Sequence, residues 1–207
     1  MNADKITVTP LAADPILKHG EPVDSLMHYE FIMYVGRPLP HKNLERLLEA
    51  FTALQLQRPN LYLALAGKKD SNYQRIENIV RAKGIPNVIF TDFVTDQQLR
   101  WMYEHCLAYV FPSLSEGFGL PGLEAMLHGA PVVSSNATCL PEVYGEAAHY
   151  FNPLDVQAMA TAINEVLTNS TLRQQLILAG KAQAAKYSWQ RMAEQTLVIY
   201  RQALGEQ

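Results

Sequence analysis

Short apolar runs alternate with amphipathic stretches along most of this chain. The first run, Phe31–Val35, is closed by a glycine and predicts a strand that is buried on both faces. Leucine and phenylalanine then recur at helical spacing from Leu44 to Leu54, which predicts a helix with one apolar face. The pair of strand and helix recurs about six times, so the pattern indicates an α/β domain.

The later runs continue this alternation towards the C-terminus. We expect further strands at 61–67, 87–90, 107–113, 130–134 and 147–151, and further helices around 76–80, 96–104, 120–127, 140–144, 155–168, 170–187 and 189–204. Because the connections are short, the strands must be parallel, with right-handed helical crossovers. The expected fold is a Rossmann-like, doubly wound parallel sheet of about six strands flanked by helices, which binds ligands at the carboxyl ends of its strands.

Residues 1–29 do not share this alternation. Ile6–Pro10 has the composition of a short strand, but Pro10, Pro15, Gly20 and Pro22 with scattered charges predict irregular chain. We expect residues 1–29 to be an interdomain linker or N-terminal extension, and residues 30–207 to form the Rossmann-like domain with its C-terminal helices.

Composition and charge narrow the classes of function. The length of 207 residues corresponds to about 1.4 domains, and 48% hydrophobic with 18% charged residues excludes a disordered chain. A net charge of −3 argues against nucleic acid as a partner, so any anion site must be local. The two cysteines, Cys106 and Cys139, form no disulfide or metal-binding pattern. With no signal peptide and no apolar run of 18 residues, we expect a cytoplasmic protein, and peripheral contact with the inner membrane face stays open.

The first candidate site follows the first expected strand. Gly36 and Arg37 end this strand, and Lys42 lies where the next helix begins. A cation is unfavourable at a helix N-terminus, unless a bound anion is shared by the backbone N–H groups, the arginine fork and the lysine. The alternative is that both charges belong to a solvated loop.

The second candidate site joins the strand at 107–113 to the helix at 120–127. Gly117 and Gly119 let the backbone approach a ligand closely, and Glu116 and Glu124 lie in the loop and one turn into the helix. Carboxylates accept hydrogen bonds from hydroxyl groups, so a sugar or a ribose is a suitable ligand. The alternative is a glycine-rich turn in which Glu124 interacts with the helix dipole.

The same segment matches the pattern G-x-G-x-x-G at Gly117, Gly119 and Gly122. A dinucleotide fingerprint also needs an acidic residue that ends the next strand, but that strand ends in Ser134, Ser135 and Asn136. The fingerprint also follows the first strand of its domain, whereas this segment follows the fourth, so we do not expect NAD. No Asp-x-Asp occurs, and we expect no metal and no cofactor.

Several segments together resemble the donor-binding, C-terminal half of a GT-B glycosyltransferase, and most closely the large retaining family four. They are Gly36-Arg37 with Lys42-Asn43, the strand ending at Gly67, TDFVTDQQL, EGFGLPGLEAMLHGAPVVSS, LPEVYGEAAHYFNPLDVQAMATAI and YSWQRMAEQTLVIYRQAL. The E-x7-E signature of that family fits Glu116 and Glu124. The resemblance covers residues 30–205, and ITVTPLAADP is similar to the stretch in which such enzymes cross from their N-terminal domain.

The resemblance implies a role for each residue. Arg37 and Lys42 would hold the diphosphate of a nucleotide sugar and stabilise it as the leaving group, and Glu116 would face the donor sugar as the third catalytic residue. Glu124 would bind the ribose, and residues around Gly67 and Phe93 would border the base. The full set of expected donor-binding residues is Gly36, Arg37, Lys42, Gly67, Phe93, Val94, Glu116, Phe118, Gly119, Leu120 and Glu124.

The resemblance also implies an activity. We expect a donor-binding domain that moves a sugar from a nucleotide sugar of the GDP-mannose or UDP-glucose type to a saccharide or lipid-linked acceptor, with retention. The family's N-terminal, acceptor-binding domain is missing from this sequence, so we expect little transfer by this chain alone. Two alternatives stay open: a non-catalytic nucleotide-binding module, and another GT-B chemistry such as that of a nucleotide-sugar epimerase. Arg37, Lys42, Glu116 and Glu124 occur together, which argues against the first.

Overall fold

Six parallel strands form the only sheet within residues 6–205, which are the residues that the computed structural model describes. The strand order is β3-β2-β1-β4-β5-β6. The strands are β1 (Phe31–Val35), β2 (Tyr62–Ala66), β3 (Val88–Asp92), β4 (Ala108–Phe111), β5 (Val132–Ser135) and β6 (Ala148–Phe151). The expected doubly wound parallel sheet is confirmed.

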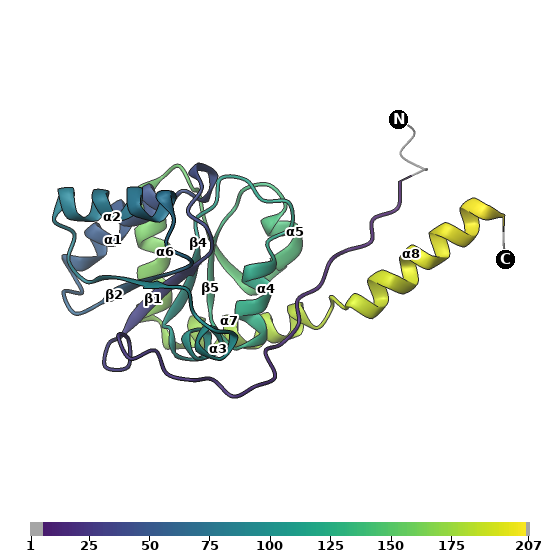
Figure 1. Ribbon diagram of the computed structural model, residues 1–207, viewed down its shortest axis with the longest axis horizontal. Helices are drawn as coiled ribbons and strands as arrows, with labels where there is room; N and C mark the ends of the chain where they lie inside the picture. The colour runs from purple at the N-terminus through teal and green to yellow at the C-terminus, as the bar shows by residue number, and fades with distance from the viewer. Residues whose placement is uncertain (1–5, 206–207) are drawn as a thin grey trace.

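Helices cover both faces of this sheet (Figure 1). They are α1 (Leu44–Gln55), α2 (Ser71–Lys83), α3 (Asp96–His105), α4 (Leu120–Leu127), α5 (Leu140–Tyr144), α6 (Val156–Thr168), α7 (Ser170–Ala184) and α8 (Trp189–Leu204), with 3-10 turns at Pro40–Lys42 and Gly145–Ala147. Contacts between α1 and α6 and between α1 and α2 join one layer, and contacts between α4 and α7 join the other. This division follows from right-handed crossovers that run in opposite directions from the centre of the sheet.

The core lies between the sheet and these two helical layers. All four residues of β4 are buried, as are the last four residues of β2, because both strands lie inside the sheet and are covered on both faces. The neighbouring strands β1 and β4 pair in parallel register, with Ile32 opposite Ala108. After β1 the chain moves to β2 and β3 on one side, and after β3 it returns to β4 on the other. The carboxyl ends of β1 and β4 therefore form the switch point of the sheet, where ligands of this fold bind.

The N-terminal segment has no helix or strand from residue 6 to residue 29. Ile6–Pro10 has the composition of a short strand, but it pairs with no strand, and Ile6 and Val8 are exposed, as expected for irregular chain. Further on, the segment packs against the domain, because Leu26 is buried in the core and Arg100 Nη1 of α3 donates to the carbonyl oxygen of Ile16 at 2.9 Å. Residues 1–5 of the expected linker and residues 206–207 of the expected domain lie outside the described residues.

The last helix, α8, extends away from the body of the domain (Figure 1). None of its residues is buried, and its exposed apolar side chains are Leu197, Val198, Tyr200 and Leu204. Among residues 6–205, no helix combines the length and the apolar character that a membrane span requires.

Candidate active site

The loops that leave β1 and β2 approach each other closely at two glycines. Gly36 has φ 136° and Gly67 has φ 153°, which are conformations that L side chains rarely adopt. A Cβ atom on Gly67 would also lie 2.7 Å from the carbonyl oxygen of Gly36. The structure thus explains why both strands end in glycine, and it brings the two predicted residues together.

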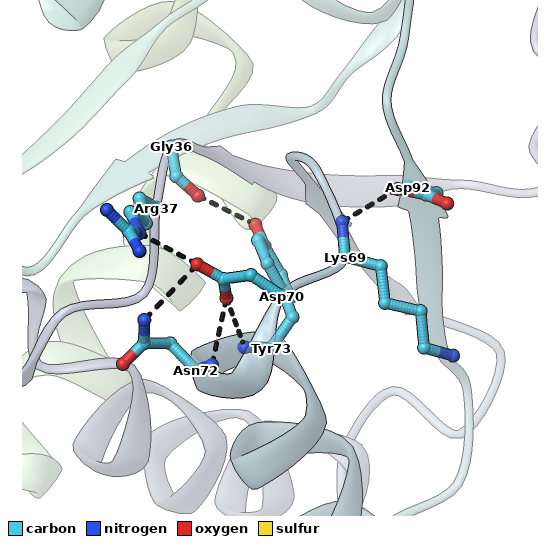
Figure 2. A network of polar contacts seen from close by, with 7 residues as sticks. All are labelled: Gly36, Arg37, Lys69, Asp70, Asn72, Tyr73 and Asp92. Carbon is cyan, nitrogen blue, oxygen red and sulfur yellow. Dashed lines mark hydrogen bonds and ion pairs between the residues drawn. The ribbon is translucent and has the colours of Figure 1, made fainter.

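Arg37 follows Gly36 and pairs with a residue that the sequence did not single out. Its Nε donates to Asp70 Oδ2 at 2.7 Å (Figure 2), and the arginine side chain is 65% exposed. Asp70 also caps α2, because its Oδ1 accepts the backbone N–H groups of Asn72 and Tyr73. The backbone hydrogen bond from Tyr73, followed by the side-chain bond from Arg37, lowers the pKa of Asp70 to about 2.

Lys42 and Glu116 form the second ion pair of the site. Lys42 Nζ donates to Glu116 Oε1 at 2.6 Å, and the two side chains are 18% and 11% exposed. The lysine also lies 5.7 Å from the centre of the Phe111 ring at the end of β4. This largely buried pair spans the switch point, since Lys42 follows β1 and Glu116 follows β4.

Asn43 fixes the backbone beside Lys42. It is buried, adopts a left-handed conformation with φ 61°, and its Nδ2 donates to the carbonyl oxygens of Pro112 at 3.0 Å and Pro153 at 2.8 Å. These two acceptors belong to the loops that follow β4 and β6. One side chain therefore ties three loops together at the carboxyl edge of the sheet.

The two residues that directly precede α5 hold the loop that carries Glu116. The backbone N–H of Glu116 donates to Thr138 Oγ1 at 3.1 Å, and Cys139 Sγ donates to the carbonyl oxygen of Glu116 at 3.3 Å. The glutamate is thus fixed both by its backbone and by Lys42.

Two glycines of the G-x-G-x-x-G match make room for Tyr144. Tyr144 donates its hydroxyl to the carbonyl oxygen of Gly119 at 2.6 Å, and a Cβ atom on Gly122 would lie 2.2 Å from that hydroxyl oxygen. Gly119 caps α4 with φ 96°, whereas Gly117 has no neighbouring atom within 4 Å of a Cβ position. Two of the three glycines therefore serve close packing.

The N-terminus of α4 faces the same edge of the sheet. Within residues 6–205, the backbone N–H groups of Phe118, Gly119 and Leu120 donate to no other protein group. The ring of Phe118 packs edge-on against Tyr187, with 5.5 Å between ring centres, so its side chain belongs to the packing of the domain. These N–H groups are available to an anion, as expected for the first turn of a helix.

Glu124 lies one turn further into α4. Burial raises the pKa of its carboxyl group, and the Tyr103 hydroxyl lies 3.4 Å from its Oε2. The carboxylate lines a cavity of about 590 Å³ between the N-terminal segment, α3 and α4, together with Asp96, Leu99 and His128.

A second cavity, of about 620 Å³, is lined by five of the other ten predicted residues. Those that do not line it are Lys42, Glu116, Phe118, Gly119 and Leu120. The cavity is lined by Val35, Gly36, Arg37, Gly67, Lys68, Asp70, Phe93, Val94, Asp96 and Leu99. Phe93 is 71% exposed at this cavity, a large aromatic surface that a flat ring can stack on. Asp96 and Leu99 line both cavities, so the two adjoin and Glu124 lies next to the Arg37 cavity.

The arrangement provides charge of both signs at one edge of the sheet. Two cations and a helix N-terminus can hold a diphosphate, while Glu116 and Glu124 can accept hydrogen bonds from hydroxyl groups. In the part of the chain that the structure describes, no three His, Cys, Asp or Glu side chains gather to hold a metal ion. Sequence reasoning missed Asp70, although an Asp that directly precedes a helix is a recognisable cap signal, and it quoted Asn43 without a structural role.

Comparison with known proteins identifies the family of the chain. The family model described as "Glycosyl transferases group 1" matches residues 21–183. The chain belongs to this family.

Curated relatives of this group 1 glycosyl transferase include two mannosyltransferases of Escherichia coli. The serotype-specific mannosyltransferase WbdA is 40% identical over 164 residues, which are 77% of this chain and 20% of WbdA. The O-antigen chain mannosyltransferase B is 34% identical over 212 residues, which are 96% of this chain and 55% of that protein. The chain thus spans about half or less of the length of these relatives.

Solved structures show the same fold. Sucrose-phosphate synthase of Thermosynechococcus elongatus has a TM-score of 0.76 at 28% identity, covering 86% of this chain and 46% of that one. The C-terminal domain of a group 1 glycosyl transferase, LpcC of Francisella tularensis, has a TM-score of 0.67 at 24% identity, covering 76% of this chain and 85% of that one. The chain has the fold of the C-terminal domain of a GT-B glycosyltransferase.

Proposed function

We propose that this chain is the donor-binding domain of a glycosyltransferase, with a nucleotide sugar as its substrate. The observation that carries the proposal is the ion pair between Lys42 and Glu116, with Arg37 lining a cavity of about 620 Å³, at the carboxyl ends of β1 and β4. This is the switch point of the sheet, the place where a bound anion of this fold is expected.

In the proposed reaction, the bond between the sugar carbon and the diphosphate oxygen breaks, and its electron pair leaves with the diphosphate. The oxygen of an acceptor hydroxyl forms the new bond, and its proton passes to an oxygen of the departing diphosphate. Arg37, Lys42 and the α4 N-terminus stabilise the charge that develops on the diphosphate. We propose that these groups, rather than a metal, supply most of that stabilisation, and that the transfer retains the configuration of the sugar, as in the family that the sequence resembles.

The sugar is proposed from the relatives. Both Escherichia coli proteins are described as mannosyltransferases, so a donor of the GDP-mannose type is favoured over one of the UDP-glucose type. The acceptor would be a saccharide or a lipid-linked saccharide, which the name of one relative, an O-antigen chain enzyme, supports.

We further propose that transfer needs a second, acceptor-binding domain. The relatives are about twice as long as the matched segment or longer, and α8 presents apolar side chains to solvent.

Both cysteines are free thiols, which suits a reducing cytoplasm, and a peripheral position at the inner membrane face stays a prediction.

Titration with GDP, UDP and ADP tests the function of the site. The chain should bind one of them saturably, and the double variant Arg37→Ala with Lys42→Ala should not bind it. Saturable binding that this double variant leaves unchanged would overturn the proposal.

A further inference from the structure

The first turn of α2 holds Arg37 in two ways (Figure 2). Asp70 accepts the Nε–H of the arginine at 2.7 Å. The hydroxyl of Tyr73 lies 2.8 Å from the carbonyl oxygen of Gly36, the residue before Arg37, and donates to it or to the carbonyl oxygen of Ala66 at 2.7 Å. The helix therefore restrains both the side chain and the neighbouring backbone of this arginine.

The carboxylate of Asp70 is itself fixed. Its Oδ1 accepts the backbone N–H groups of Asn72 at 2.8 Å and Tyr73 at 3.0 Å, and its Oδ2 accepts Asn72 Nδ2 at 3.2 Å as well as Arg37. Rotation of this carboxylate would break the helix cap, so it offers Arg37 a rigid partner.

The bond to Asp70 uses one side of the guanidinium group. Within residues 6–205, Arg37 donates to protein only through Nε, so Nη1 and Nη2 have no protein acceptor. Arg37 lines the cavity of about 620 Å³. A guanidinium group whose Nη atoms are unpaired can form two parallel hydrogen bonds to a phosphate.

We propose that Asp70 is a positioning residue for donor binding, which fixes Arg37 through Nε so that Nη1 and Nη2 face the diphosphate; this inference rests on the proposed function of the site. An exposed arginine samples many rotamers, and a ligand must restrict them when it binds. When the rotamer is fixed before binding, most of this loss of side-chain conformational entropy is avoided.

The negative charge of Asp70 acts in the opposite direction. A carboxylate beside a diphosphate repels it and also competes with it for the arginine. If competition were the larger effect, removal of the charge would tighten binding. Positioning of Arg37 is the larger effect in this proposal. The sign of the change in affinity on removal of the Asp70 charge therefore distinguishes positioning from competition.

The test variant is Asp70→Asn, because asparagine also caps helices but has only one side-chain oxygen to share between the cap and Arg37. The affinity for GDP or UDP should fall about 2- to 12-fold, which is the effect of ordering one long side chain. The affinity for the matching nucleoside, which has no phosphate, should not change. The matched control is Asp155→Asn, at the cap of α6 and outside both cavities, and it should bind as the wild type does.

Two further measurements separate positioning from a general loss of structure. In an Arg37→Ala background, Asp70→Asn should no longer weaken binding, because only the repulsion between Asp70 and the diphosphate is then removed. In the free chain, the Nε–H proton of Arg37 should exchange slowly with solvent by NMR, and Asp70→Asn should make this exchange fast. Unchanged or tighter binding in Asp70→Asn would overturn the proposal while leaving the function of the site intact. If the wild-type chain binds no nucleoside diphosphate, both the proposed function and this proposal are overturned.

Discussion

Lys42 and Glu116 are 74 positions apart in the sequence, and Lys42 Nζ donates to Glu116 Oε1 at 2.6 Å. Both side chains are largely shielded from solvent, at 18% and 11% exposure. A diphosphate that binds beside Lys42 therefore meets a lysine that is already oriented, and a carboxylate that opposes it. Each side of this pair has its own testable consequence.

Removal of the lysine should weaken the binding of a nucleoside diphosphate. Lys42→Ala is expected to lower the affinity about 10- to 150-fold, because a hydrogen bond to a charged group contributes about 1.5–3 kcal/mol. Titration calorimetry measures this. The control is Lys83→Ala, which removes a lysine paired with Glu49 at the surface and should leave affinity unchanged. An equal loss in both variants would mean that only net charge matters.

Neutralisation of the glutamate should have the opposite effect on the nucleoside diphosphate without its sugar. Glu116→Gln is expected to bind it about 2- to 5-fold more tightly, because removal of the repulsion between the carboxylate and the diphosphate is worth about 0.5–1 kcal/mol. The same calorimetry measures the change. Weaker binding in Glu116→Gln would show that the carboxylate supports the diphosphate rather than opposing it.

The packing of Tyr144 against α4 predicts different effects for two glycines of the same motif. Gly122→Ala should lower the free energy of unfolding by at least about 2 kcal/mol, because the new Cβ would lie 2.2 Å from the tyrosine oxygen. Gly117→Ala should stay within about 0.5 kcal/mol of the wild type, since nothing lies within 4 Å of its Cβ position. Urea unfolding measures both. Equal effects would contradict the packing role of Gly122.

Glu124 should give the stability a specific pH dependence. Burial raises the pKa of its carboxyl group in the folded chain, so its favourable contribution is complete below the unfolded pKa and is lost as the pH rises through the folded value. Glu124→Gln should therefore be more stable than the wild type at pH 7 and equal to it near pH 4, and should bind nucleotide more weakly.

Thermal unfolding at the two pH values measures this difference. Glu194→Gln on the exposed side of α8 is the matched control and should show no such dependence. A stability gain for Glu124→Gln that is as large at pH 4 as at pH 7 would rule out this account of the residue.

The sheet and most of the site follow from local sequence. The apolar run at Phe31–Val35 ends in Gly36, and the carboxyl ends of parallel strands share one edge of the sheet. The sequence alone therefore predicts one crevice that contains Gly36, Arg37, Gly67 and Phe93. The strand-like composition of Ile6–Pro10 forms no strand, because a β-like segment becomes a strand only where a neighbouring strand offers hydrogen bonds.

The residues that support the site were not predictable in this way. Asp70 meets Arg37 across 33 positions, Asn43 meets Pro112 across 69, and Tyr144 meets Gly119 across 25. Each contact depends on how loops from different strands pack at the edge of the sheet. No local periodicity encodes that packing.

The central claim is that a nucleoside diphosphate binds at the switch point between β1 and β4. NMR titration of the isotope-labelled chain with GDP or UDP tests it most directly, because it reports a ligand's location residue by residue. The account predicts that the largest shifts occur in the backbone signals of Gly36, Arg37, Lys42, Gly119 and Leu120, with those of α7 unchanged. Saturable binding that leaves these five signals in place, and moves others instead, would contradict it.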